Sequence, residues 1–211
     1  MKYKFIVIEG LIGAGKTSLS KRIAERYNSK LILEQFADNP FLPKFYDNPG
    51  KYSFPLELSF LAERYQQLKD ELATGDLFKS FLISDYYFPK SLIFAKSTLV
   101  DDEYNLFRKL FNIIHSTLPR PDLYVYLHLS TENALKNIEK RGRSYEQSIE
   151  AEYLDVLKKN YFEYFKQEKN IRFLIIDTNG IDFVNNNTDF EAVIDIVFNK
   201  EYPIGINRVI L

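Results

Sequence analysis

An apolar run that leads directly into a glycine-rich loop constrains this chain more than any other feature of its sequence. Residues 6–17 read IVIEGLIGAGKT, a strand pattern followed by a complete G-x-x-x-x-G-K-[ST] motif. Glycines let the backbone of such a loop curl until successive N–H groups point at one anion. Lys16 then brings a positive charge to the β- and γ-phosphates, and the hydroxyl of Thr17 can bind Mg²⁺. The helix expected over 16–27 presents its positive end to the same phosphates.

This motif predicts a binding site for a nucleoside triphosphate, with ATP and Mg²⁺ as the expected cofactors. The alternative, an ordinary glycine-rich turn, is disfavoured because the strand and the helix that the chemistry requires flank the loop. The residues expected to bind the nucleotide lie within this loop and the start of the helix: Gly10, Gly13, Ala14, Gly15, Lys16, Thr17 and Ser18.

Composition and charge exclude several other classes of protein. The 211 residues are enough for one well-buried core, so we expect a single domain over 1–211. A formal net charge of −1 gives no general attraction to nucleic acid or to an anionic membrane, and neither is expected as a partner. The absence of cysteine rules out disulfides and zinc–cysteine sites, and two histidines are too few for a histidine metal cluster.

The start of the chain leaves no room for a signal peptide, because four residues lead directly into the first strand. No apolar run approaches the length of a transmembrane helix. Both observations predict a cytoplasmic protein.

Apolar β-rich runs alternate with helical patterns along the chain, which predicts parallel βαβ units. We expect a three-layer α/β fold in which helices cover both faces of a five-stranded parallel sheet. The expected strands are 5–9, 31–33, 81–84, 123–129 and 172–176. The expected helices are 16–27, 42–46, 54–72, 88–96, 103–117, 132–140, 149–167 and 190–198, with a polar loop over 179–189.

Carboxylates follow two of these strands, at the edge of the sheet where ligands bind in such folds. Asp85 ends the strand 81–84 and can hold a water of the Mg²⁺ shell, so Thr17 and Asp85 are the expected metal-binding residues. The alternative role for Asp85 is to cap the helix over 88–96. Glu34 follows the strand 31–33, and its carboxylate can accept a proton from a substrate hydroxyl that attacks the γ-phosphate. The alternative is a surface glutamate in a loop.

Two arginines around a glycine, Arg141 and Arg143, follow the helix expected over 132–140. This arrangement suits a flexible lid whose guanidinium groups neutralise charge as it spreads over the transferred group. The alternative is a basic helix end that complements the helix dipole. We predict that both arginines are catalytic, together with Lys16 and Glu34.

Several motifs in register make the chain resemble the deoxynucleoside kinase family, in particular bacterial deoxyadenosine/deoxyguanosine kinase-like enzymes. The resemblance spans about residues 4–165. Its motifs after the glycine-rich loop are Glu34, DNPFL at 38–42, FY at 45–46, YSFPLE at 52–57, Asp85, RPDL at 120–123, RGRSYE at 141–146 and EYL at 152–154.

The resemblance implies a phosphate-loop kinase with a helical lid, which phosphorylates the 5′-hydroxyl of a deoxynucleoside, with purines favoured. It implies that Glu34 is the general base and that Tyr46 and Glu146 hold the 3′-hydroxyl of the sugar. Tyr52 would line the pocket, and Glu57 and Asp85 would complete the substrate site. The family also implies a homodimer formed through long helices.

The chain departs from the family pattern directly after Asp85, where Tyr86 stands in place of the usual arginine. Tyrosine cannot supply that positive charge, and Lys90, one turn further along, is the candidate to replace it. Two alternative functions stay open. One is a nucleoside monophosphate kinase resembling thymidylate kinase, although the missing arginine argues against it. The other is a catalytically reduced nucleotide-binding regulatory protein, which Tyr86 favours.

A second departure is Glu57, at the position where the family usually has a glutamine that reads the base. An ionised glutamate only accepts hydrogen bonds, so it requires two donors from its ligand. Guanine offers N1–H and its exocyclic amine, which predicts a preference for deoxyguanosine over deoxyadenosine. The alternative is that Glu57 pairs with Arg64, two turns along the same helix, and reads nothing.

Overall fold

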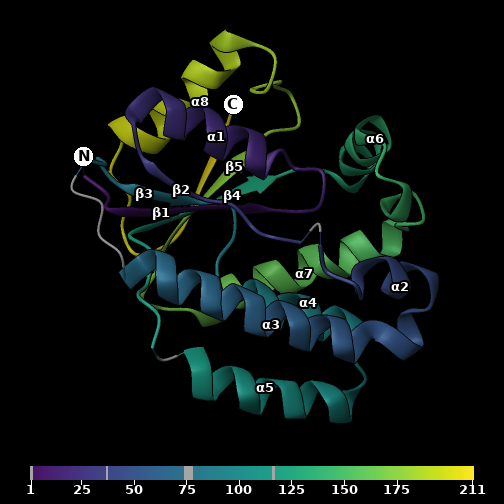
Figure 1. Ribbon diagram of the computed structural model, residues 1–211. Helices are drawn as coiled ribbons and strands as arrows, with labels where there is room; N and C mark the ends of the chain where they lie inside the picture. Colours follow the sequence, from purple (N-terminus) through teal and green to yellow (C-terminus); the bar gives the residue numbers. More distant parts are fainter. Residues whose placement is uncertain (1, 37, 74–77, 116) are drawn as a thin grey trace.

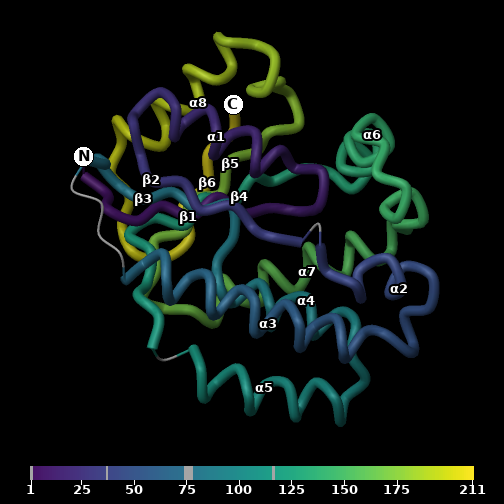
Figure 2. The backbone as a smooth tube through the Cα atoms, in the orientation of Figure 1, coloured from purple at the N-terminus to yellow at the C-terminus, as the bar shows by residue number. Residues whose placement is uncertain are grey.

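The computed structural model describes residues 2–36, 38–73, 78–115 and 117–211, and the structural statements below concern those residues. Six parallel strands form one sheet in the order β2-β3-β1-β4-β5-β6 (Figures 1 and 2). Their bounds are β1 Phe5–Gly10, β2 Lys30–Ile32, β3 Leu82–Ser84, β4 Leu123–His128, β5 Arg172–Asp177 and β6 Gly205–Ile210.

The helices cover both faces of this sheet, which confirms the expected three-layer architecture. Their bounds are α1 Lys16–Tyr27, α2 Leu42–Asp47, α3 Pro49–Ala73, α4 Lys90–Thr98, α5 Asp101–His115, α6 Thr131–Arg141, α7 Ala151–Gln167 and α8 Asn187–Asn199. One face carries α1 and α8, and the other carries α3, α4 and α7 with α5 outside them (Figure 1). Within the described residues no helix is long and apolar enough to cross a membrane.

β1 lies at the centre of the sheet and is buried along its whole length. Successive side chains of a strand point to opposite faces. Ile6 and Ile8 therefore pack into the cluster that holds the buried faces of α1 and α8, whereas Phe5 and Val7 pack with residues of α4 and α7. This two-sided burial explains the continuous apolar run that precedes the glycine-rich loop.

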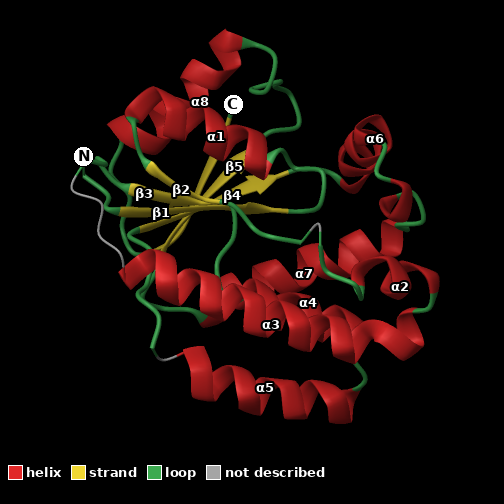
Figure 3. Cartoon of the chain, in the orientation of Figure 1, coloured by secondary structure: helices red, strands yellow, loops and turns green. Residues whose placement is uncertain are grey.

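The carboxyl ends of the strands meet at one edge of the sheet, beside α2 and α6 (Figure 3). The loops that leave this edge carry the glycine-rich motif, Glu34 and Asp85. In open α/β sheets this edge is where ligands bind. The fold thus brings segments from distant parts of the sequence to one place.

The expected count of five strands is wrong, because β6 adds a sixth strand at the edge of the sheet. Ile206 and Ile210 of β6 are exposed, while Asn207 faces inward and donates from Nδ2 to the Phe173 carbonyl at 3.1 Å. Apolar and polar residues therefore do not alternate along this strand, and the sequence pattern does not predict it.

Several helix ends also differ from expectation. α3 begins at Pro49 rather than at residue 54, and Ser53 Oγ donates to the Pro49 carbonyl at 2.6 Å within its first turn. The polar loop ends before α8, whose first turn is capped by the side chain of Asn186. Residue 116, inside the helix expected over 103–117, lies outside the described residues.

Candidate active site

The glycine-rich loop between β1 and α1 has the backbone shape that only glycine allows at two positions. Gly13 and Gly15 both have φ of +84°, in the left-handed region. A Cβ on Gly13 would lie 2.6 Å from the Ala134 carbonyl oxygen, and one on Gly15 would lie 2.8 Å from the Phe183 ring. The loop is therefore held between α6 and the segment that precedes α8.

Lys16 lies across the mouth of this loop. Its Nζ donates to the carbonyl oxygens of Gly10 at 3.0 Å and Leu11 at 2.8 Å. Burial, with the nearby charge of Lys90, lowers the pKa of Lys16 to about 8. The ammonium group is still charged at neutral pH, so a partly buried positive charge lies against the loop.

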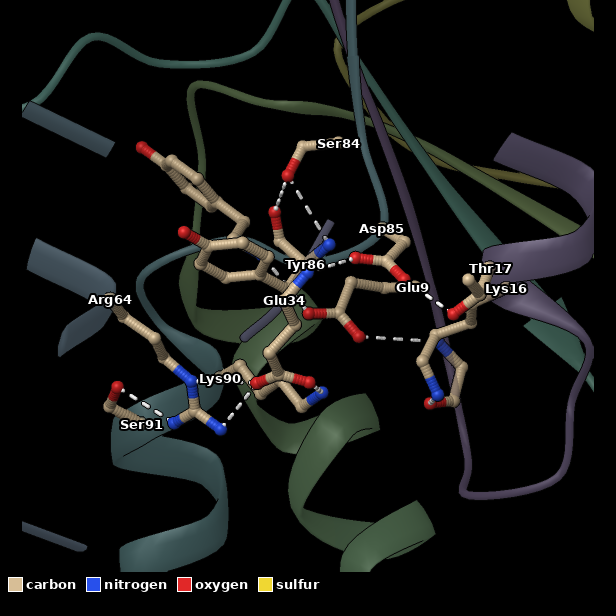
Figure 4. Close-up of polar contacts among 12 residues, drawn as sticks. Glu9, Lys16, Thr17, Glu34, Arg64, Ser84, Asp85, Tyr86, Lys90 and Ser91 are labelled. Atoms are coloured by element: carbon tan, nitrogen blue, oxygen red, sulfur yellow. Dashed lines mark hydrogen bonds and ion pairs between the residues drawn. The ribbon is translucent and has the colours of Figure 1, made fainter. Parts of the chain in front are cut away.

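Asp85 joins the glycine-rich loop to the segment that follows β2. Its Oδ2 accepts from the Thr17 hydroxyl at 2.5 Å and its Oδ1 accepts from the Glu34 backbone N–H at 2.7 Å (Figure 4). Asp85 does not cap α4, because that helix begins at Lys90 after Pro89 and has no side-chain cap. The capping alternative is therefore wrong.

Thr17 and Asp85 together offer the hard oxygen donors that Mg²⁺ prefers. The described residues hold no group of three or more His, Cys, Asp or Glu side chains placed for a metal ion. A site of this kind suits a cation that keeps several waters and takes the rest of its ligands from phosphates, as Mg²⁺ does.

Glu34 is nearly buried and is held by two cations from different helices (Figure 4). Arg64 of α3 donates to Oε1 from Nε at 2.9 Å and Nη2 at 2.7 Å, and Lys90 of α4 donates to Oε2 at 2.6 Å. Burial alone would raise the pKa of Glu34, but Lys90 and Arg64 lower it to about 2. Glu34 is thus not a surface glutamate, and Lys90 supplies a charge that Tyr86 cannot.

Tyr86 fills a structural position instead. Its side chain is fully buried, and its hydroxyl donates to Gln67 Oε1 on α3 at 2.7 Å. The ring belongs to the cluster that includes Phe107 and Phe111 of α5. The residue directly after Asp85 therefore secures helices against the sheet, while the cation beside Glu34 comes from the next helix.

Glu9 lies beside the site without lining the cavity, and no motif of the sequence pointed to it. It is fully buried at the end of β1, where its carboxylate accepts from the Tyr161 hydroxyl at 3.0 Å and the Tyr87 N–H at 3.2 Å. Burial raises the pKa of Glu9, and the charges of Lys90 and Lys16 oppose that shift. The available signal was a carboxylate inside an otherwise apolar strand.

Of the two arginines expected in a lid, Arg141 is the last residue of α6 and Arg143 lies just beyond it, and the two share one carboxylate. Arg141 and Arg143 both form ion pairs with Glu146, which is buried in the 3₁₀ turn Ser144–Glu146. Gly142 between them has φ of +73° and ends the helix. The guanidinium of Arg143 also lies 4.5 Å from the centroid of the Phe36 ring.

A single cavity brings most of the expected site residues together. Tyr46 lines it and stacks on Tyr145 with ring centroids 5.9 Å apart. Tyr52 packs against the neighbouring aromatic cluster of α2 and α3 and is not among the cavity-lining residues of the described chain. The cavity is lined by Lys16, Thr17, Glu34, Tyr46, Glu57, Arg64, Asp85, Lys90, Arg141, Arg143, Glu146 and Tyr153, with apolar side chains between them.

Glu57 lines this cavity and forms no ion pair with any of the residues that the structure describes. Its Oε1 accepts from the Thr98 hydroxyl at 3.0 Å, and its Oε2 has no hydrogen-bond partner among the described residues. Arg64 is engaged elsewhere, by Glu34 and by Ser91 Oγ at 2.9 Å. The alternative in which Glu57 pairs with Arg64 is therefore wrong. Burial raises the pKa of Glu57 to about 7, against the charge of Arg64.

A phosphate loop on a doubly covered parallel sheet, with an ionised carboxylate lining the same cavity, defines a phosphate-loop phosphotransferase. Comparison with known proteins agrees with this class. The family model for deoxynucleoside kinases matches residues 6–201. The chain belongs to the deoxynucleoside kinase family.

Individual relatives extend along most of the chain. It is 39% identical to a deoxyguanosine kinase of Bacillus subtilis (strain 168) over 196 residues, which cover 90% of this chain and 93% of that one. It is 36% identical to a deoxyadenosine kinase of Dictyostelium discoideum, over 85% of this chain and 74% of that one. A structure of deoxyadenosine kinase from M. mycoides with bound dATP superposes with a TM-score of 0.80 at 28% identity, covering 93% of this chain and 100% of that one.

These findings confirm the resemblance on which the expected activity rested. The chain is a deoxynucleoside kinase, an enzyme that phosphorylates the 5′-hydroxyl of its substrate. The alternatives of a nucleoside monophosphate kinase and of a regulatory protein without activity are not favoured.

Proposed function

We propose that this enzyme transfers the γ-phosphoryl group of Mg²⁺-bound ATP to the 5′-hydroxyl of a purine deoxynucleoside. One observation carries the proposal: the ionised carboxylate of Glu34, held by Arg64 and Lys90, lines the same cavity as Lys16 and Thr17 of the phosphate loop. The relatives named for deoxyguanosine and deoxyadenosine support a purine as the acceptor.

The donor side is formed by the phosphate loop. When phosphates bind, Lys16 can exchange the carbonyl oxygens of Gly10 and Leu11 for phosphate oxygens without leaving its position. Thr17 and Asp85 would hold Mg²⁺, which when bound neutralises charge on the β- and γ-phosphates.

On the acceptor side, Glu34 orients the 5′-hydroxyl by accepting its hydrogen bond. The new bond forms between the 5′-oxygen and the γ-phosphorus while the bond to the leaving oxygen of ADP breaks, and the hydroxyl proton passes to the carboxylate of Glu34. A carboxylate with so low a pKa is a weak base. Its main contribution is therefore to hold the nucleophile in line, because phosphoryl transfer proceeds through a loose transition state.

The lid arginines complete the proposed site. Arg141 and Arg143 line the cavity, and both form ion pairs with the single carboxylate of Glu146. We propose that the guanidinium groups turn to the transferred phosphoryl group, which releases Glu146 to bind the sugar 3′-hydroxyl together with Tyr46.

A homodimer, a cytoplasmic location and a single domain over 1–211 stay predictions. Light scattering coupled to size-exclusion chromatography measures the mass in solution, and twice the chain mass of 24.9 kDa is expected for the dimer.

The function is tested by incubating the purified protein with Mg²⁺-ATP and a panel of nucleosides, deoxynucleosides and their monophosphates. ADP release should depend on a purine deoxynucleoside, and mass spectrometry of the product should identify the 5′-monophosphate. The proposal would be contradicted if only monophosphates were phosphorylated, or if none of the compounds in the panel were phosphorylated.

A further inference from the structure

Glu57 carries a buried carboxylate oxygen that the protein leaves without a partner. Its side chain is 2% exposed, and Oε2 is the one carboxylate oxygen among the buried unpartnered side-chain atoms of the described residues. Leaving a buried polar group unsatisfied costs folding free energy, so such an atom in a cavity calls for a ligand. The cavity that Glu57 lines is the one proposed above for the nucleoside.

The groups around Glu57 do not neutralise it. Arg64 on the same helix is bonded to Glu34 and Ser91, and Lys90 of α4 is bonded to Glu34. The titratable groups that act on Glu57 or are affected by its charge come from every packed element: Tyr46 of α2, Arg64 of α3, Lys90 of α4, Tyr153 of α7 and Glu34 after β2. Burial raises the pKa of both tyrosines above their ordinary value, so they remain neutral.

The two forms of this carboxyl group match different purine edges. As a carboxylate, Glu57 offers two acceptors, which pair with the N1–H and exocyclic amine of guanine but oppose the acceptor N1 of adenine. As a carboxylic acid, Glu57 can donate from Oε2 and accept at Oε1. That pair fits N1 and the 6-amino group of adenine, and it also fits O6 and N1–H of guanine.

We propose that Glu57 selects between purines through its own protonation: the acid admits both deoxyadenosine and deoxyguanosine, whereas the carboxylate admits deoxyguanosine alone. The proposal rests on the proposed function of the cavity as a nucleoside site. In this proposal Oε2 is the oxygen that excludes deoxyadenosine when it is ionised, since Oε1 already accepts from the Thr98 hydroxyl.

The titration of Glu57 lies in the range where enzymes work. Burial raises its pKa to about 7, with Arg64 and the Thr98 hydroxyl acting against the shift. The group is neutral below that pH and charged above it. The acid fraction therefore falls about tenfold between pH 6 and pH 8, and the ability to accept deoxyadenosine should fall with it.

The test compares kcat/KM for deoxyguanosine and deoxyadenosine between pH 6 and pH 8. Both substrates use the same donor site and the same Glu34, so pH effects on catalysis cancel in the ratio. The ratio should rise about tenfold in the wild type and stay flat in Glu57→Gln, whose amide always has one donor and one acceptor. A flat wild-type ratio, or an equal rise in Glu57→Gln, would overturn the proposal.

A second variant keeps the inference testable if Glu57→Gln folds poorly. Thr98→Val removes the hydrogen bond that stabilises the carboxylate, so the midpoint of the ratio should move to higher pH. Ser97→Ala on the same helix is the matched control, because Ser97 Oγ accepts from Asn160 instead, and its midpoint should equal that of the wild type. An unmoved midpoint in Thr98→Val would count against Glu57 as the titrating group. Failure of both nucleosides to react would overturn the proposed function itself.

Discussion

Two cationic side chains, Arg64 and Lys90, keep the carboxylate of Glu34 charged inside the cavity. Burial disfavours the charged form, and only the paired contacts of Arg64 and Lys90 reverse that effect. Because the pKa of Glu34 is lowered to about 2, its negative charge is present throughout the range in which enzymes act. Its contribution to folding stability is complete above the ordinary pKa and is lost only as the pH falls towards 2.

Replacing Glu34 by glutamine should lower kcat by about 100-fold or more while ATP binding changes little. Glutamine keeps the shape of the side chain but cannot take the 5′-hydroxyl proton. Steady-state kinetics with both substrates, together with calorimetric binding of ATP, separates the two effects. An unchanged kcat would remove Glu34 from the catalytic step.

Lys90→Met should move the acid limb of the kcat/KM profile to higher pH by about one unit or more. The variant leaves Arg64 alone to oppose the burial of Glu34, so the pKa of that carboxyl group rises and its charge is lost earlier on acidification. Lys90→Arg should restore the profile. Lys96→Met is the control, since Lys96 of the same helix pairs with Glu163 at the surface. Equal profiles for Lys90→Met and the wild type would show that Lys90 does not act through Glu34.

At the scale of elements, patterns predicted the central parts of the fold well. β1 and α1 were expected almost to the residue, because two-sided burial and a glycine-rich turn leave a strong local signal. β6 was missed because its exposed isoleucines and inward Asn207 give no alternation, and it is defined by pairing with β5. The start of α4 was misplaced by two residues, and Asp85, for which capping that helix was the alternative role, does not cap it.

The lid arginines pair with Glu146 in the structure, and the proposed mechanism turns them to the transferred phosphoryl group. Arg143→Lys should lower kcat more than it weakens nucleoside binding, because lysine keeps the charge but lacks the planar fork that bridges two phosphate oxygens. Lys140→Ala, at an exposed position in the last turn of α6 just before Arg141, is the control. If Arg143→Lys retains the wild-type kcat, the arginine serves only Glu146 and the helix end.

For the molecule as a whole, the sequence indicated which residues matter but not how they meet. Glu34 and Asp85 were found because they follow strands, yet the hydrogen bond that the Glu34 backbone N–H donates to Asp85 depends on strand order. The pairing of Lys90 with Glu34 requires α4 to lie beside the end of β2, which no local pattern encodes. Oε2 of Glu57 likewise lacks a partner among the described residues because Arg64 binds Glu34 and Ser91 instead.

Binding of a ligand at the phosphate loop is coupled to the stability of the whole folded chain. Lys16→Ala should abolish phosphorylation but leave the fold intact, because Lys16 bonds only two loop carbonyls and burial disfavours its charge. Ligand at 100 times its Kd adds about 2.7 kcal/mol of stability. For a chain of this size that raises the unfolding temperature by roughly 5–10 °C, at about 2–4 °C per kcal/mol.

Thermal unfolding with and without Mg²⁺-ATP measures this coupling. The wild type and Lys21→Ala, altered at an exposed position of α1, should both show the rise in unfolding temperature. Lys16→Ala should unfold near the wild-type temperature without ligand and show little or no rise with it. A full rise in Lys16→Ala would mean that ATP binds outside the phosphate loop, and normal turnover would remove Lys16 from the reaction.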